Sequence, residues 1–543
     1  MTFGPLHQLR AHLQRLFHKQ DTSLAAQLWR DYTAHPSKHP RIPNVSYAGY
    51  QMGNQPIPNR AGPLFRVEEF GAHPDTSSEC DEAVAAAVHA AEEAGGGVVL
   101  FPEGIFYFSS VIWVHASNVV IRGAGQGKTT LYFTQPLEAA YRHSRMGEWS
   151  WTGGLVWFLP RELRHELETS DWAWGTNEGW TGNRELAKLT QPVVRGTRRI
   201  HLTDTMEILP GDEIILTLTN TPDNSLLSHL CGDLPPGSYD FAQLASSLHK
   251  QKNYRQLRWP VRVEAVEENS LILAQPTKVD LRLEWDPTVT SLGPHVRESG
   301  IEDCTIRMHP SAQQPHNQDH GFNGPHFQAA LDCWARRVEV IDADNGFGFT
   351  SAKGITLHQV AVSGRARHHS FICREQSHDC LVHEFSIAAA TTALAAQALT
   401  HGLNVEGYSS GNVWSEGEME GTFDSHRRVP FENVRTCIRL TNTGSLGGAK
   451  KAGPHWGARF VHWNVEVTNK RAFAVRLEHH APYSAMVGVT GPSKPHPKPS
   501  EFSGDLHSIL ADVGTTVSPR NLYLAQLKHR LESSAARTRK EQL

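Results

Sequence analysis

The sequence is poor in cysteine, and its cysteines are not arranged to hold a metal or a disulfide framework. There are seven of them, an odd number, and no two are spaced as Cys-x-x-Cys. This spacing excludes a zinc knuckle and argues against a small disulfide-stapled fold. We expect four cysteines near the starts of predicted strands to be reduced and largely buried: Cys304, Cys333, Cys380 and Cys437.

Long apolar runs and a strong net charge are also missing. No segment approaches the roughly 18 apolar residues of a membrane-spanning helix, and the formal net charge of the 543 residues is only −4. Neither a membrane nor a nucleic acid is therefore predicted as a partner. The amino terminus lacks the apolar core of a secretory signal, so no signal peptide is visible in this chain.

The most regular pattern lies in residues 66–133. A helix is predicted where Val84 and Val88 recur at helical spacing, and the glycines at 95–97 end it. Short apolar strands then follow, each bounded by Gly, Pro or polar turn residues. They are predicted at 98–101, 106–108 and 111–114.

This order of elements resembles the opening coils of the pectate-lyase-like right-handed parallel β-helix superfamily. The resemblance implies a solenoid whose open end is capped by the helix, and most members of that superfamily act on polysaccharides. It also implies a secreted or periplasmic location. A looser resemblance, through Ser46 to Tyr50 and the turn at 344–346, is to bacterial secreted β-helix proteins of uncertain activity, and it carries over no catalytic residues.

The predicted fold is all-β: a single-stranded right-handed parallel β-helix with an N-terminal helical arm, a β-rich insertion and a C-terminal helix. Its segments are a helical and extended arm (1–60), the first coils with the capping helix (61–135), a Trp-rich and β-rich insertion (136–290), the main β-helix with the cleft (291–490), and a linker with the final helix (491–543). The insertion's tryptophans are read as its core more readily than as sugar-stacking platforms.

A glycine-rich segment at 123–129 looks like a phosphate-binding loop. The Walker pattern requires a glycine five residues before the Gly-Lys pair, and Arg122 occupies that position. The residues after it, Leu131 to Phe133, continue as a strand, so no helix N-terminus is available for a phosphate. We interpret the segment as a turn between two coils.

Uneven repeats become legible after Gly300. One set of strand starts is predicted at Ile355, Leu381, Val413 and Val434, and a second at Phe347, Phe371 and Leu403. A parallel β-helix places equivalent positions of successive coils in line. The residues before the second set therefore form a predicted ladder of Asn345, His369 and His401 on one face, next to the segment 424–428.

That face carries the chemistry of a polysaccharide lyase. Elimination from a uronate needs a cationic group to neutralise its carboxylate, for which arginine is suited, and a base that titrates near neutrality, for which histidine is suited. The predicted catalytic residues are His369, His401, His426, Arg427 and Asp344. The predicted substrate-binding residues are Lys353, His368, Arg374, Arg428, His320 and Asn323.

Two other function classes stay open. A glycoside hydrolase would use a carboxylate pair drawn from Asp342, Asp344, Glu384 and Asp424. A non-catalytic glycan-binding β-helix would use neither mechanism. The alternating Glu416, Glu418 and Glu420 are read as a solvated strand face.

The predicted partner is a polysaccharide or oligosaccharide, and assembly into a homo-oligomer is left open. No cofactor is predicted, because the clustered carboxylates that calcium prefers are not seen. Asp319, His320 and His326 are a weak alternative as metal ligands.

Overall fold

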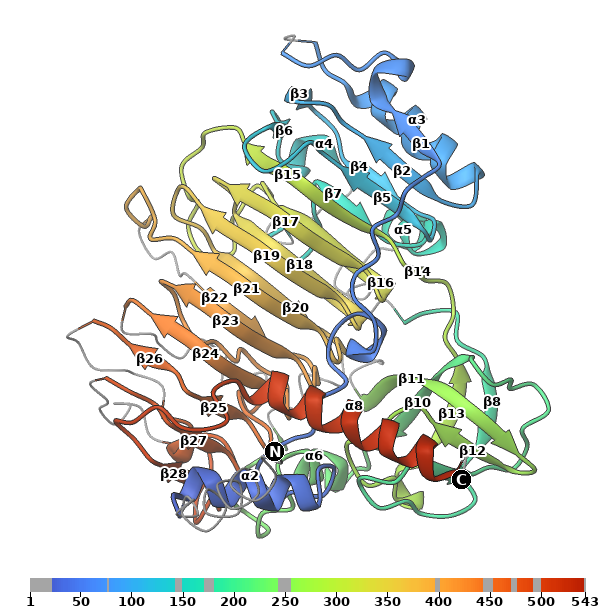
Figure 1. Cartoon of the computed structure of the whole chain (residues 1–543), viewed down its shortest axis with the longest axis vertical. Helices are drawn as coiled ribbons and strands as arrows, with labels where there is room; N and C mark the ends of the chain where they lie inside the picture. Colours follow the sequence, from blue (N-terminus) through green and yellow to red (C-terminus); the bar gives the residue numbers. More distant parts are fainter. Residues whose placement is uncertain are drawn as a thin grey trace, which may run out of the picture.

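The main body of the protein is a solenoid of parallel strands, which lie side by side in Figure 1. The computed structural model describes residues 22–75, 78–141, 149–169, 180–242, 255–395, 401–442, 453–469, 476–491 and 500–541, with side chains to 536 in the last range. The first 21 residues of the predicted arm and two tryptophans of the predicted insertion, Trp172 and Trp174, lie outside these ranges. The architecture confirms the predicted right-handed parallel β-helix.

One long sheet, sheet A, runs the length of the solenoid, and every pairing in it is parallel. Its path is β1 (Leu64–Arg66), β2 (Gly97–Leu100), β5 (Val119–Arg122), β15 (Gly300–Met308), β17 (Trp334–Ile341), β19 (Thr356–Ser363), β21 (Leu381–Ile387), β23 (Val413–Met419), β24 (Val434–Leu440), β25 (Val461–Trp463), β27 (Ala485–Val487) and β28 (Ile509–Ala511). Beside this path lie β3 (Gly104–Phe108), β6 (Thr129–Phe133) and β26 (Glu466–Val467). The predicted starts Leu381, Val413 and Val434 stand opposite one another.

A second parallel sheet, sheet B, forms another side of the coils. Its order is β22 (His401–Val405), β20 (His369–Arg374), β18 (Asn345–Lys353), β16 (Pro325–Leu331), β7 (Val156–Phe158) and β4 (Ile112–Val114), with β14 (Val296–Arg297) paired to β16. Asn345 pairs with His369, and His369 pairs with His401. The predicted ladder is therefore confirmed in register.

Apolar side chains stack inside the coils from one end of the solenoid to the other. Phe347 and Phe371, at equivalent positions of adjacent coils, stack with ring centroids 5.6 Å apart. At the first end the predicted helix is α3 (Asp81–Glu93), whose buried Val84 and Val88 cover the open core. In Figure 1 this helix lies at the top of the solenoid.

The glycine-rich segment 123–129 is a turn between β5 and β6, as predicted. Thr129 already belongs to the next strand. Its hydroxyl accepts the backbone N–H of Ala124 at 2.8 Å and donates to the carbonyl of Pro102. The turn is therefore closed by the chain itself.

An antiparallel sheet projects from the solenoid and carries its own apolar core. Its order is β8 (Glu185–Lys188), β13 (Thr288–Ser291), β10 (Glu213–Thr219), β11 (Gln256–Glu267), β12 (Ser270–Leu273) and β9 (Arg199–His201). Short helices α4 (Leu137–Ala140), α5 (Arg161–Thr169) and α6 (Ser225–Leu230) lie in the same part of the chain. Ion pairs from Lys278 to Asp379 and from Arg262 to Asp332 connect this sheet to the coils.

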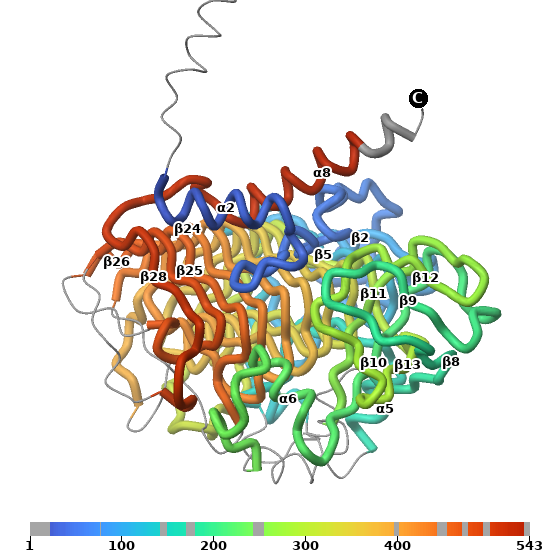
Figure 2. Tube along the Cα trace, turned by 90° about the horizontal axis from the view of Figure 1, so that it is seen from below, coloured from blue at the N-terminus to red at the C-terminus, as the bar shows by residue number. Residues whose placement is uncertain are grey.

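The two ends of the described chain pack on sheet A, as Figure 2 shows from below. Helix α2 (Leu24–Ala34) and the first residues of α8 (Leu522–Glu541) cover outward apolar side chains at the strand starts, among them Val413 and Val434. The chain between α2 and β1 runs along the solenoid, with the Tyr50 N–H bonded to Thr356 Oγ1 at 2.7 Å.

All seven cysteines are free. Cys304, Cys333 and Cys380 are buried as expected, but Cys437 is only partly buried, so that part of the prediction was wrong. Its φ of +54° turns the side chain outward, where Sγ lies 3.1 Å from the Arg520 carbonyl. Among the described residues, no helix is long and apolar enough to cross a membrane.

Candidate functional site

Four of the predicted histidines come together at the start of sheet B strands. His369 and His401 begin β20 and β22, and His368 and His426 lie beside them; we call these four residues the histidine cluster. The ring centroids of His369 and His401 are 4.7 Å apart, and those of His368 and His369 are 4.1 Å apart. The strand register places His401 beside His369, and the next coil contributes His426.

Oxygen atoms face the Nδ1 atoms of the cluster. His368 Nδ1 lies 2.8 Å from Asp319 Oδ2, and His401 Nδ1 lies 2.6 Å from Asp424 Oδ2. His369 Nδ1 lies 3.0 Å from Asn345 Oδ1. Because the Asn345 amide nitrogen donates to the Trp149 carbonyl, its oxygen is an acceptor and His369 Nδ1 is the donor.

The cluster is almost fully buried, and His426 is its most exposed member, at 6%. The Trp151 indole lies over it, with ring centroids 4.7 Å from His426 and 4.8 Å from His369. Burial lowers the pKa of His369 well below its ordinary value, and burial also lowers the pKa values of His368 and His426. These three imidazoles are therefore neutral at neutral pH.

The predicted arginines lie next to the cluster but are paired with buried carboxylates. Arg374 pairs with Glu406, and Arg427 Nε lies 3.3 Å from the other oxygen of that carboxylate. Arg428 lies 3.2 Å from Glu375. The two glutamates are fully buried, so most of the predicted cationic strip is neutralised inside the protein.

Asn323 and Asp344 lie beside the cluster, and Lys353 lies at the far end of β18. Asp344 pairs with Arg365 at 2.6 Å and accepts two backbone N–H groups, so it has a structural role. Lys353 pairs with Asp379 at 2.6 Å. The Asn323 amide donates to backbone carbonyls of the segment 149–153.

His320 does not join the cluster. Its side chain is about half exposed and pairs with Glu138. Asp319, His320 and His326 do not form one of the possible metal-ligand groups among the described residues. His326 instead bonds Thr350 at 3.0 Å.

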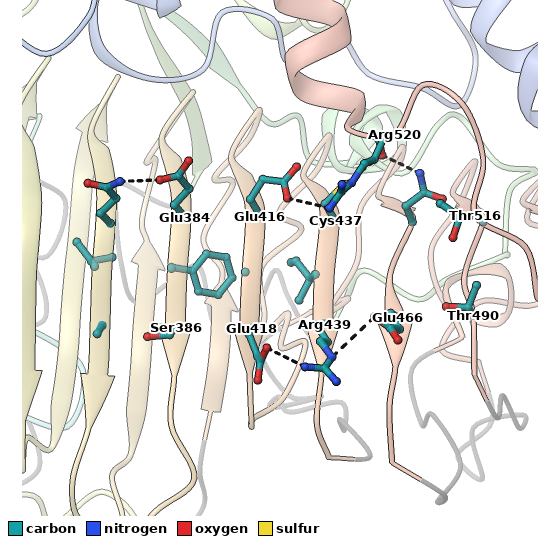
Figure 3. A pocket seen from close by; sticks show the side chains of 18 of the residues that line it. Glu384, Ser386, Glu416, Glu418, Cys437, Arg439, Glu466, Thr490, Thr516 and Arg520 are labelled. Carbon is teal, nitrogen blue, oxygen red and sulfur yellow. Dashed lines mark hydrogen bonds and ion pairs between the residues drawn. The ribbon is translucent and has the colours of Figure 1, made fainter.

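Sequence reasoning missed an open groove along the outer face of sheet A. It encloses about 880 Å³ and crosses β19, β21, β23 and β24 before reaching the coils of β26 and β27. Figure 3 shows two rows of polar side chains along it. One row contains Gln359, Glu384, Glu416 and Cys437, and the other contains Ser386, Glu418, Arg439, Glu466 and Thr490.

A repeated backbone feature turns the first row outward. Gln359, Glu384, Glu416 and Cys437 all have φ between +52° and +55°. Each interrupts the strand alternation at the same register, because Phe385 pairs with Gly417 and Gly417 pairs with Ile438. Side chains of successive coils are thereby aligned at the strand spacing of about 4.8 Å.

Contacts between the coils hold the groove side chains in place. Glu384 accepts from Gln359 at 2.9 Å, and Glu416 accepts from Asn521 at 2.9 Å. In the second row, Arg439 lies between Glu418 and Glu466, at 3.1 and 3.8 Å. The alternation of Glu416 and Glu418 in the sequence predicts only a solvated strand face. The sequence does not show which side chains the neighbouring coils place beside these two glutamates.

Two family models match parts of the chain. Residues 64–146 match a model described as rhamnogalacturonase A/epimerase, pectate lyase-like. Residues 398–537 match a domain of unknown function. A segment of 73 residues is 37% identical to Alginate lyase 7 of Azotobacter vinelandii and covers 12% of this chain but only 8% of that protein.

Solved structures with similar coils include three of different kinds. The tailspike protein gp49 of Pseudomonas phage LKA1 aligns with a TM-score of 0.42 and 13% identity over 80% of this chain and 71% of that chain. The mannuronan C-5 epimerase AlgE6 A-module of Azotobacter vinelandii gives 0.34 and 12% over 83% and 79%. The surface adhesin PfbA of Streptococcus pneumoniae gives 0.39 and 8% over 80% of each chain.

Proposed function

From the match of residues 64–146 to a pectate-lyase-like family model and from the parallel β-helix fold, we propose that this protein is a carbohydrate-active enzyme that binds a polysaccharide in the sheet A groove. The observation that carries the proposal is the groove itself. It is open along its length and crosses successive coils, so it can accept a chain longer than the groove. Hydrogen-bonding side chains recur at each coil, which suits a polymer of repeated hydroxyl groups.

The charge of the groove favours a neutral saccharide. Four glutamates and two arginines line it: Glu384, Glu416, Glu418, Glu466, Arg439 and Arg520. This excess of negative charge repels a polymer of uronates, whose carboxylates would need cationic partners. The proposal therefore departs from the uronate substrate expected from the sequence.

Hydrolysis is the reaction that the groove supports best. Glu384 and Glu416 lie at the same register of adjacent strands, and both face the groove. Retaining glycosidases place two carboxyl groups about 5 Å apart across the scissile bond. The side chain of Glu416 is the less exposed of the two, at 29% against 46%. We propose that this pair supplies the acid and the nucleophile.

The test is turnover of a panel of neutral and uronate polysaccharides, followed by new reducing ends. We expect activity on a neutral polymer, and Glu384→Gln and Glu416→Gln should each reduce it at least about 100-fold, the usual size of an acid–base contribution. Glu185→Gln, at an exposed site on the projecting sheet, is the matched control. Full activity in both groove variants would exclude this pair.

Elimination is the second candidate, favoured by one observation. His426 and Arg427 are adjacent and are less buried than His369, with Arg427 18% exposed. A uronate carboxylate could reach that guanidinium with a histidine beside it. The local identity to an alginate lyase supports this reaction. The same panel distinguishes it, because elimination leaves an unsaturated uronide that absorbs ultraviolet light and hydrolysis leaves none.

A further inference from the structure

We propose that His368, His369 and His401 bind one divalent transition-metal ion through their Nε2 atoms. The three side chains are nine-tenths or more buried, and their ligand atoms lie within 4.8 Å of one another. None of the three Nε2 atoms has a hydrogen-bond partner among the described residues. This inference does not depend on the proposed action on polysaccharides.

The Nδ1 contacts leave Nε2 as the ligand atom. Asp319, Asn345 and Asp424 each place an oxygen within 3.0 Å of an Nδ1. Metal-binding histidines commonly donate this second nitrogen to a carboxylate or carbonyl oxygen, which fixes the tautomer and the ring orientation. His368 and His369 share that arrangement, and the His401 Nδ1 lies 2.6 Å from Asp424 Oδ2.

The supporting residues are themselves held. Asp319 Oδ2 also accepts the Ser150 hydroxyl at 2.5 Å. The Asn345 amide is fixed by the Trp149 carbonyl. Both contacts come from the segment that places the Trp151 indole over the cluster, which provides the apolar shell expected around a buried metal.

A metal-free cluster would be costly. Each buried polar atom left unpaired destabilises a protein by about 1–3 kcal/mol, and three such nitrogens belong to neighbouring rings here. One cation would satisfy all three at once. The two carboxylates that support the ligands, Asp319 and Asp424, are 2% and 0% exposed and suit a dication.

The donor set selects the kind of metal. Imidazole nitrogens bind zinc, copper, iron and nickel, whereas calcium and magnesium prefer oxygen ligands. In a tetrahedral zinc site the nitrogens lie about 3.4 Å apart. The ligand atoms lie within 4.8 Å of one another, so metal binding requires the three rings to move slightly closer together. Three histidines leave a fourth coordination position on the metal, and the inference does not specify the ligand that fills it.

The experiment measures metal content in the full-length protein. The protein is stripped with a chelator, incubated with Zn²⁺, passed through a desalting column and analysed by mass spectrometry for zinc. Co²⁺ substituted for zinc reports the ligand geometry through its visible absorption. We expect one tightly held equivalent in the wild type.

His369→Ala and His401→Ala should each lose that equivalent. The matched control is the double variant His358→Ala, His383→Ala, which removes two stacked histidines from the outer face of sheet A and should keep it. Circular dichroism of the stripped proteins checks folding. Should the alanine variants not fold, the isosteric Asp319→Asn removes only a supporting carboxylate and should weaken Zn²⁺ binding about 10- to 100-fold.

Two results would overturn the inference. One is a folded wild type that retains no zinc or cobalt after desalting. The other is a set of folded cluster variants, Asp319→Asn included, that bind Zn²⁺ as tightly as the His358→Ala, His383→Ala control.

Discussion

Asp379 is held between two lysines inside the protein. Lys353 Nζ lies 2.6 Å from one carboxylate oxygen and Lys278 Nζ lies 2.7 Å from the other, and all three side chains are less than 10% exposed. Burial alone would raise the pKa of Asp379, but the two ammonium groups outweigh it and hold that pKa well below its ordinary value. The carboxylate is therefore ionised and ties the projecting sheet to the coils.

We predict that Asp379→Asn lowers the free energy of unfolding by about 3–5 kcal/mol, because it leaves two buried ammonium groups without a counterion. Urea unfolding followed by tryptophan fluorescence measures the effect. Glu267→Gln is the control, since the Arg199–Glu267 pair is half exposed and should contribute little. An equal shift in the two variants would contradict the structural role given to Asp379.

At the residue scale, the sequence did not predict which charged side chains pair with each other. Lys353 and Arg374 have the residue types of a substrate-binding strip, and both lie on the expected strands. Their partners Asp379 and Glu406 come from the following turn or coil, 26 and 32 residues later. Sequence spacing predicts which coil a residue occupies, but it does not show which charges meet once the coils stack.

At the scale of elements, His378 joins a turn of the coils to the projecting sheet. Its Nε2 donates to the Arg258 carbonyl of β11 at 2.9 Å, and its Nδ1 lies 3.0 Å from Ser410 Oγ. Both nitrogens are satisfied in the neutral ring. Burial, followed by the charge of Lys353, lowers the pKa of His378 to about 3.

This burial predicts a dependence of stability on pH. A histidine in the unfolded chain has a pKa near 6.5. Between about pH 6.5 and pH 3 the unfolded state therefore binds a proton at His378 that the folded state does not bind. The contribution is fully present above pH 6.5 and is lost as the pH falls, by about 1.4 kcal/mol per pH unit.

We expect His378→Gln to flatten the plot of unfolding free energy against pH by about one proton across this window. Urea titrations between pH 4 and pH 7 measure the slope. His507→Gln, at a partly exposed site, should leave the slope unchanged. A His378→Gln slope that matches the wild type would show that this imidazole is protonated in the folded protein.

Elements were predicted from the sequence where the pattern is local or periodic. The capping helix and the ladder from Asn345 to His401 have the expected positions. Both follow from spacings that can be read in the sequence: the helical spacing of apolar residues and the number of residues in each coil. The groove could not be foreseen in the same way. The groove depends on a left-handed backbone conformation at Glu384 and Glu416. Glutamate does not favour that conformation, so its presence in the sequence does not predict it.

On the scale of the whole molecule, the two ends of the described chain hold each other. Gln526 of α8 is fully buried; its amide accepts the Val45 N–H at 2.9 Å and donates to the Pro43 carbonyl at 3.0 Å. The Arg530 guanidinium lies 4.4 Å from the centre of the Tyr47 ring. The arm is thus fixed between α8 and sheet A.

The sequence predicts a helical and extended arm, and the contacts of Tyr50 show that it packs along the solenoid. It also predicts a final helix, but not the surface that this helix covers. In Figure 1 α8 starts beside β24 and β25 and runs past the strand ends toward the projecting sheet. The apolar face of this helix is evident from its leucines, but the surface that it covers belongs to coils more than eighty residues earlier, such as that of Thr436.

We predict that Gln526→Ala loosens the arm without unfolding the coils. The substitution leaves the buried Val45 N–H and Pro43 carbonyl unpaired, at a cost of about 1–3 kcal/mol for each group. Hydrogen exchange should accelerate in residues 43–48 and remain slow in β19 to β23, whose ladder bonds do not involve the arm. Lys528→Ala, on the exposed side of the same helix, is the control. Because the groove wall at Arg520 and Asn521 leads directly into α8, exchange that accelerates equally along the groove strands would mean that the ends of the chain stabilise the whole solenoid rather than the arm alone.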